Sequence, residues 1–272
     1  METSIENGTA QGTVAGLIDG LASSRITVVD LTTPLSAATP TLELPEPFAN
    51  LIDFSLEEVS AYNERGPFWK HHNIHTGEHI GTHLDAPVHW ATGRGGKDVS
   101  RIEPGRLVGP ALVLDVTDEV AADPDFLLDV GHIRAWESEH GPLHDGGWLL
   151  IRTGWESRAG SRQEFLNNDG HGRPHSPGLT VECAQWIARE SGLSGIGVET
   201  VGIDAGGAGG QEPPFPAHHF LLGNDKYGIT SLRNLGELPP VGAAIVVAPL
   251  PIVDGTGSPA RVFALRDQSQ AQ

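Results

Sequence analysis

Short apolar segments alternate with polar segments rich in glycine or proline along most of the chain. Runs of valine, isoleucine and leucine bounded by Gly, Pro or Asp predict strands. Such runs occupy residues 25–31, 109–116, 148–152, 195–203 and 243–248. Apolar residues at helical spacing predict helices over residues 14–22 and 180–191, the second with Thr180 as its N-cap. Strands separated by helices and long loops predict an α/β fold.

A proline-rich segment, residues 33–56, follows the first predicted strand. Its irregularly spaced apolar residues predict a long loop whose side chains turn toward the protein body. These are Leu42, Leu44, Phe48 and Phe54. At 272 residues the chain is near the upper limit for one hydrophobic core. We therefore expect a flexible N-terminus over residues 1–12, one domain over residues 13–266 and a polar tail over residues 267–272.

Composition narrows the range of partners. The formal net charge of −18 would repel nucleic acid and anionic membranes, so we expect neither partner. The single cysteine, Cys183, excludes an internal disulfide, and the chain has neither a signal-peptide pattern nor a membrane-spanning apolar run. We therefore expect a cytoplasmic location. The glycine-rich runs at residues 93–98 and 205–210 lack the pattern of a phosphate-binding loop and are predicted to be ordinary loops.

The candidate chemistry is concentrated in residues 79–89, which read His-Ile-Gly-Thr-His-Leu-Asp-Ala-Pro-Val-His. In an extended chain alternate side chains share a face, which would place His79, His83, Asp85 and His89 together and the intervening apolar residues in the core. Imidazole and carboxylate groups at this spacing suit a divalent transition metal. Two histidines and one carboxylate would leave coordination positions open, which indicates a catalytic site rather than a structural one.

The spacing also requires a bend in the chain. A straight strand would separate His79 from His83 by about 13 Å, too far for two ligands that each lie about 2 Å from one ion. Gly81 supplies the backbone freedom for this bend, and Thr82 can orient a ligand through a hydrogen bond.

This segment also resembles a known family. The pattern His-x-Gly-Thr-His-x-Asp-x-Pro-x-His is the signature of the cyclase-type metal-dependent hydrolases, which include bacterial kynurenine formamidases and isatin hydrolases. The resemblance extends over most of the chain, through residues 28–31, 149–155, 176–180, 202–205 and 256–265. It implies a single α/β domain with the swivelling β/β/α fold of this family. Residues 63–79, 212–220 and 227–235 are most similar to the isatin hydrolases.

The resemblance implies a role for each residue of the signature. His79, His83 and Asp85 look like the metal ligands, and His89 looks like the residue that moves a proton between water at the metal and the substrate. The formamidases carry a histidine near position 218 and a glutamate twelve residues later, which look like ligands of a second metal. This chain has Thr230 or Ser231 in that place. We therefore expect one divalent ion, manganese in the first instance and zinc as the alternative.

Further residues are expected around the metal. By the same resemblance His218 and Ser231 are catalytic residues beside the metal ligands, although the residues alone leave open which of His218 and His219 faces the site. An aromatic substrate needs flat apolar walls. The candidate substrate-binding residues are Phe48, Trp69, Trp90 and His219.

The predicted function is hydrolysis of a small cyclic aromatic amide, isatin or a close analogue, by water activated at the metal. One alternative is an N-formylkynurenine formamidase, and another is a cyclase or dehydratase that acts on a polyketide-like substrate at the same metal site. A non-catalytic protein that binds a metal or a ligand is a third class, and His89 argues against it because binding alone needs no proton shuttle. The family resemblance also implies a homodimer or a higher homo-oligomer.

Overall fold

The computed structural model describes residues 12–44 and 46–268, so residues 1–11 of the expected flexible terminus and residues 269–272 of the expected polar tail lie outside the described residues. The helices are α1 (Thr13–Ala22), α2 (Thr117–Ala122), α3 (Val130–His140), α4 (Arg162–Leu166) and α5 (Val181–Glu190). The strands are β1 (Ile26–Asp30), β2 (Ser55–Asn63), β3 (Gly66–His75), β4 (His83–Asp85), β5 (Val108–Asp115), β6 (Leu127–Leu128), β7 (Trp148–Arg152), β8 (Gly178–Leu179), β9 (Gly195–Val198), β10 (Tyr227–Thr230), β11 (Ala243–Pro249) and β12 (Gly257–Asp267).

The five predicted strands form at β1, β5, β7, β9 and β11, and the two predicted helices form at α1 and α5. Thr180 is the N-cap of α5, and its side chain accepts a hydrogen bond from the backbone N–H of Cys183. Strand β9 ends at Val198, earlier than the apolar run predicts. The predicted α/β class is confirmed.

The main sheet has eight strands in the order β1-β12-β11-β5-β7-β9-β10-β4. Its last strand, β4, also pairs with β12, so seven of the strands form a closed circuit and β1 adds to β12 from outside. Within this sheet, the neighbouring strands β5, β7, β9 and β10 run parallel to one another. Strands β4, β11 and β12 pair with their neighbours in antiparallel fashion. The architecture is therefore a mixed α/β fold built around a strand barrel.

Successive residues of the central strands enter two different cores. In β7, Leu149 and Ile151 pack in the core that includes helices α3 and α5, whereas Trp148 and Leu150 pack in the core enclosed by the barrel strands. Strands β5 and β9 share this property of burial on both faces, which explains why they read as continuous apolar runs. In β11 burial alternates instead, and Ala243, Ile245 and Val247 pack in the barrel core. Cys183 lies buried in the first core, and burial raises the pKa of its thiol to about 12.

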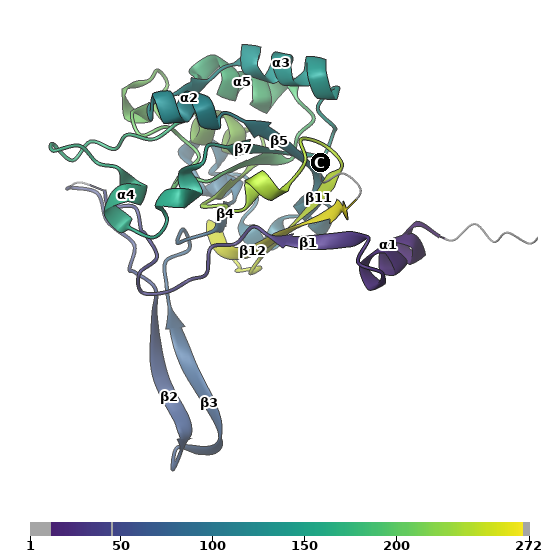
Figure 1. The fold of residues 1–272 in the computed structure, drawn as a ribbon. Coiled ribbons are helices and arrows are strands. Elements are labelled where there is room, and N and C mark those ends of the chain that lie inside the picture. The colour runs from purple at the N-terminus through teal and green to yellow at the C-terminus, as the bar shows by residue number, and fades with distance from the viewer. Residues whose placement is uncertain (1–11, 45, 269–272) are drawn as a thin grey trace, which may run out of the picture.

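Strands β2 and β3 form a separate two-stranded ribbon, here called the arm (residues 55–75), which extends away from the body (Figure 1). No pattern in the sequence predicted this ribbon. Most of its side chains are exposed, including the apolar residues Leu56, Tyr62, Phe68, Trp69 and Ile74.

The segment before the arm differs from the expectation. Leu42, Leu44 and Phe48 are exposed, so the prediction that the loop over residues 33–56 turns these side chains inward is wrong for them. Pro40 and Thr41 are buried instead, and Arg162 donates a hydrogen bond to the carbonyl of Thr41. Among the described residues, no helix is long and apolar enough to cross a membrane.

Candidate metal centre

The chain bends at Gly81, as the spacing of the histidines requires. Gly81 has a φ of +63°, and a Cβ atom there would lie 2.7 Å from Leu35, so this position strongly favours glycine. The strand that follows is short and is held between β10 and β12. Pro87 then begins a 3-10 turn that ends at His89. The bend and the turn bring His79 and His89 to the same side of β4, and Leu84 is buried in the barrel core.

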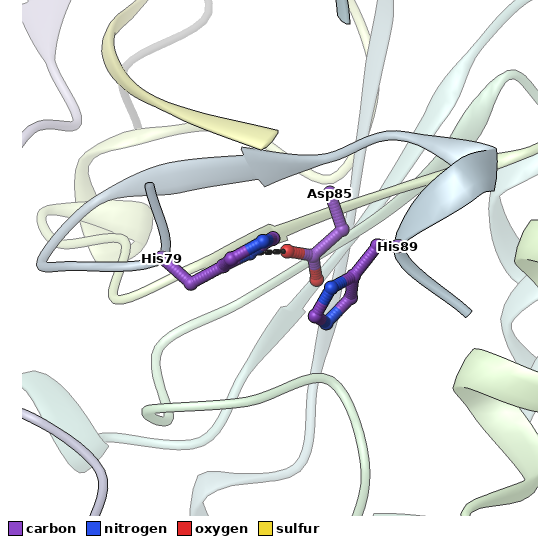
Figure 2. A group of neighbouring side chains, drawn as sticks. All are labelled: His79, Asp85 and His89. Atoms are coloured by element: carbon purple, nitrogen blue, oxygen red, sulfur yellow. Dashed lines mark hydrogen bonds and ion pairs between the residues drawn. The ribbon is translucent and has the colours of Figure 1, made fainter. Parts of the chain in front are cut away.

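Asp85 is the point on which the histidines converge (Figure 2). Its Oδ1 lies 2.7 Å from Nδ1 of His79 and 3.3 Å from Nε2 of His83. Ligand atoms of His79, Asp85 and His89 lie within 4.8 Å of one another. Two ligands that are each about 2.1 Å from one ion, at about a right angle, are about 3 Å apart. The separations around Asp85 therefore match those of ligands to a common metal.

The hydrogen bonds of His83 support the same interpretation. Its Nδ1 lies 2.8 Å from the carbonyl oxygen of Gly81, which can only accept, so Nδ1 carries the proton. In a neutral ring this leaves Nε2 as a bare acceptor that faces another acceptor, the carboxylate of Asp85. A cation between the two atoms removes the repulsion. The donor set and its geometry therefore fit a divalent ion. Burial alone would raise the pKa of Asp85, but its contacts with His83 and His79 hold this pKa well below its usual range.

His89 and His218 also lie close to Asp85. The His89 ring stacks on that of His79 with 3.9 Å between centroids and lies 5.5 Å from that of His218. Burial, supported by the nearby histidines, lowers the pKa of His89 to about 3, so this ring is neutral near pH 7. Within the described part of the chain, its ring nitrogens have no hydrogen-bond partner, which leaves them available to a ligand.

A buried carboxylate orients His218. Asp204 accepts a hydrogen bond from Nδ1 of His218 at 2.5 Å, and Nε2 of the same ring lies 3.8 Å from Oδ2 of Asp85. Burial alone would lower the pKa of His218, but the hydrogen bond to Asp204 and the charges of Asp204 and Asp85 outweigh it and raise the pKa. The structure therefore decides which histidine of the pair faces the cluster, because the ring of His219 packs against Phe220 instead.

One aromatic wall adjoins these rings. The Trp90 ring lies 4.6 Å from that of His218 and 5.6 Å from that of Phe215, measured between centroids. Trp90 is the predicted substrate-binding residue that the structure brings to the cluster. Phe48 is 62 % exposed in the loop before the arm, and Trp69 is 48 % exposed on the arm, where it stacks on His71.

Ser231 is connected to the cluster through its backbone, which is hydrogen-bonded to Thr82. Its carbonyl oxygen accepts a hydrogen bond from the Thr82 hydroxyl at 2.7 Å, and its N–H donates to the carbonyl of Thr200. Thr230 has a direct contact, because its hydroxyl lies 2.9 Å from Nδ1 of His83 and donates toward the carbonyl of Gly81. A threonine thus occupies the place where the formamidases were expected to carry a metal-ligating glutamate.

Four residues that lie around the cluster were not among those predicted from the sequence. They are Glu78, Asp204, Phe215 and Thr256. Asp204 and Thr256 belong to segments that support the family resemblance, residues 202–205 and 256–265, but no local pattern connects them to the histidines. Asp204 and Thr256 come close to the histidines only when the chain folds.

The chain is similar to known proteins over most of its length. The sequence pattern of the cyclase family matches residues 29–205. Isatin hydrolase of Roseibium aggregatum is 45 % identical over 259 residues, which cover 94 % of this chain and 98 % of that protein. Kynurenine formamidase of Bacillus cereus is 28 % identical over 235 residues, which cover 86 % and 94 %.

A solved structure is similar over nearly the whole chain. An isatin hydrolase bound to the product analogue thioisatinate superposes with a TM-score of 0.92 at 44 % identity, covering 96 % of this chain and all of that one. The resemblance read from the signature at residues 79–89 is thereby confirmed: the chain belongs to the cyclase family.

Proposed function

We propose that the protein is a metal-dependent hydrolase that opens the cyclic amide of isatin to give isatinate. The observation that carries this proposal is the convergence of two imidazole nitrogens on the Asp85 carboxylate, in a chain 45 % identical to an isatin hydrolase. The reaction is the addition of water across the amide C–N bond, so the site must direct water to the carbonyl and return a proton to the nitrogen.

His79, His83 and Asp85 would hold the ion. His83 suits this role because its Nδ1 is already committed to the carbonyl of Gly81, which leaves Nε2 free to bind a metal. His89 is reserved for proton transfer because its ring is neutral and has no other hydrogen-bond partner among the described residues. We propose one ion, manganese in the first instance with zinc as the alternative, since Thr230 replaces the expected ligand of a second one.

When bound, a divalent ion supplies Lewis acidity toward the amide carbonyl and lowers the pKa of nearby water. The side chains account for the remaining steps. His89 accepts a proton from the attacking water as the new C–O bond forms at the amide carbon. The same imidazole returns this proton to the ring nitrogen as the C–N bond breaks, so the products are an amine and a carboxylic acid, which releases its proton to solvent near pH 7 and becomes the carboxylate.

The other site residues would position the substrate. Trp90, with Phe215 behind it, provides a flat apolar wall for an aromatic ring. His218, whose Nδ1 is bonded to Asp204, would donate a hydrogen bond from Nε2 to a substrate carbonyl when the ring is protonated, the form that its raised pKa favours. Ser231 would contribute through the backbone that fixes Thr82, and His219 would lie at the rim of the pocket. We also propose that the domain has the swivelling β/β/α fold.

A formamidase activity is the alternative that has an observation in its favour, the 28 % identity to kynurenine formamidase. Thr230 argues against it because a threonine hydroxyl contacts His83 where that family was expected to bind a second ion. Two tightly bound ions per chain would favour the formamidase.

We also propose a homodimer in which a second copy covers the apolar side chains of the arm. Phe68 is 86 % exposed and Ile74 is 67 % exposed, and a two-stranded ribbon has no core of its own to stabilise it. In such a dimer the arm would carry Trp69 to the substrate pocket of the partner protomer. Light scattering of the wild type and of Phe68→Ser tests this proposal: a dimer that the substitution weakens supports it, and a wild-type monomer contradicts it.

Substrate turnover tests the proposed function. The purified protein, loaded with manganese, is assayed with isatin and with N-formylkynurenine under the same conditions. We expect the absorbance of isatin to disappear at a rate far above that of the formamide. His83→Ala should lose both bound metal and turnover, and activity on neither substrate would contradict the proposal.

A further inference from the structure

Glu78 and Thr256 form a short hydrogen-bonded chain that ends on His79, outside the proposed set of metal ligands. Nε2 of His79 lies 2.9 Å from the hydroxyl oxygen of Thr256. That hydroxyl lies 2.5 Å from Oε2 of Glu78, and the backbone N–H of Thr256 lies 3.2 Å from both carboxylate oxygens. The opposite nitrogen of the ring, Nδ1, faces Asp85 at 2.7 Å.

The number of available hydrogens determines which group donates and which accepts in each of these hydrogen bonds. A carboxylate has no hydrogen to give, so the single hydrogen of the Thr256 hydroxyl is donated to Glu78. The hydroxyl oxygen can then only accept from His79, and Nε2 of His79 must carry the proton. In a neutral imidazole the other nitrogen is then bare, and it points at the position where the ion is proposed to bind.

The surrounding backbone holds Thr256 in place for this contact. The carbonyl of Thr256 accepts a hydrogen bond from the N–H of Ala86, directly after β4. The next residue is Gly257, where a Cβ atom would lie 2.6 Å from Cε1 of His79. A side chain at Gly257 would therefore push the ring away, so the segment is built to bring Thr256 close to the edge of the imidazole.

We propose that Glu78 and Thr256 are positioning residues that hold His79 in the tautomer protonated at Nε2, so that Nδ1 is always ready to bind the metal. The inference rests on the metal site proposed above. Without these hydrogen bonds His79 would populate both tautomers. The tautomer protonated at Nδ1 cannot bind the metal through that atom, so metal affinity would fall. Partners of this kind typically contribute 10- to 100-fold in metal affinity.

Titration calorimetry of the metal-free protein with MnCl₂ and with ZnCl₂ measures this effect directly. Thr256→Val keeps the shape of the side chain and removes its hydroxyl, and we expect metal affinity to fall by about 10- to 100-fold. Glu78→Gln should give a smaller loss in the same direction. Thr256→Ser should restore the affinity of the wild type. Glu190→Gln, an exposed residue at the end of α5, is the matched control for loss of one negative charge.

A spectroscopic measurement separates this role from a general loss of structure. Nitrogen-15 NMR of the metal-free wild type should show His79 protonated at Nε2, and Thr256→Val should show a mixture of tautomers. Unchanged affinity in both Glu78→Gln and Thr256→Val, or a wild-type His79 protonated at Nδ1, would overturn the proposal. If Thr256→Val does not fold, Glu78→Gln and Thr256→Ser decide the question.

The outcomes also distinguish this inference from the proposed function. A wild type that binds no metal contradicts both. A wild type that binds metal, with variants of equal affinity, overturns only the role of Glu78 and Thr256.

Discussion

Replacing Asp204 by asparagine is a demanding test of how the site is built. The carboxylate accepts hydrogen bonds from the N–H of Ala217 at 2.7 Å, from the N–H of His218 at 3.2 Å and from Nδ1 of His218 at 2.5 Å. Asparagine is nearly the same size and keeps one acceptor oxygen for Ala217. Its NH₂ group would face the two donors of His218, so both of these hydrogen bonds would be lost.

The magnitudes follow from those contacts. The Asp204 carboxylate accepts both lost hydrogen bonds. The short one from Nδ1 is worth about 1.5–3 kcal/mol and the longer one from the backbone about 1 kcal/mol, so the free energy of unfolding should fall by about 2–4 kcal/mol. His218 would also lose the partner that fixes its proton on Nδ1. We expect kcat/KM for isatin to fall by about 10²- to 10³-fold, the range for loss of one preorganised hydrogen-bond donor to the reacting carbonyl.

The chain contains a matched control for this substitution. Asp125 accepts a hydrogen bond from Nδ1 of His175 at the same 2.5 Å, but the two side chains are 45 % and 37 % exposed. Asp125→Asn should therefore cost no more than about 1 kcal/mol and leave turnover unchanged. Urea unfolding and steady-state kinetics of both variants give the comparison. Equal turnover of Asp204→Asn and wild type would refute the argument that this carboxylate orients a functional histidine.

Three further predictions follow from the structure. Gly81→Ala forces a left-handed φ on alanine and a clash with Leu35, so we expect a loss of about 1–3 kcal/mol in urea unfolding and weaker metal binding; wild-type values for both would contradict this. Trp90→Leu should raise KM for isatin while leaving metal content unchanged, since the ring packs against His218 and is not one of the proposed metal ligands; an unaltered KM would count against the proposed role of Trp90 as a wall for the substrate. Burial lowers the pKa of Lys226 from its ordinary value of 10.5 to about 8, so the unfolded chain binds more protons between these values and stability rises with pH there. The difference in unfolding free energy between wild type and Lys226→Met should therefore change in favour of the wild type between about pH 8 and about pH 10.5, by up to about 3 kcal/mol. A difference that does not vary with pH would show that Lys226 does not titrate in this way.

The sequence predicted the parts of the fold that have strong periodic or apolar signals. Strand β7 reads as an uninterrupted apolar run because both of its faces are buried, and its predicted bounds are those observed. Helix α5 combines a threonine N-cap with a buried face that includes Ile187 and Ala188. The bend at Gly81 followed from the distance that two ligands must span, and its φ of +63° agrees.

The features that were missed lack such signals. The arm has little buried apolar surface, so its strands show no regular alternation, and the exposed loop around Phe48 was mistaken for one that packs inward. The closure of the barrel by β4 and β12 depends on pairing between residues far apart in the chain. Asp204 meets His218, and Thr256 meets His79, only in the folded chain, so no spacing rule within the sequence could have identified these two residues.

The central claim is that a metal ion held by His79, His83 and Asp85 is required to open isatin. The most direct test follows isatin absorbance with one preparation in three states: as purified, after removal of metal by a chelator, and after manganese is added back. The account predicts turnover in the first state, its loss in the second and its return in the third, with one ion bound per chain. Undiminished turnover by protein shown by elemental analysis to be free of metal would contradict it.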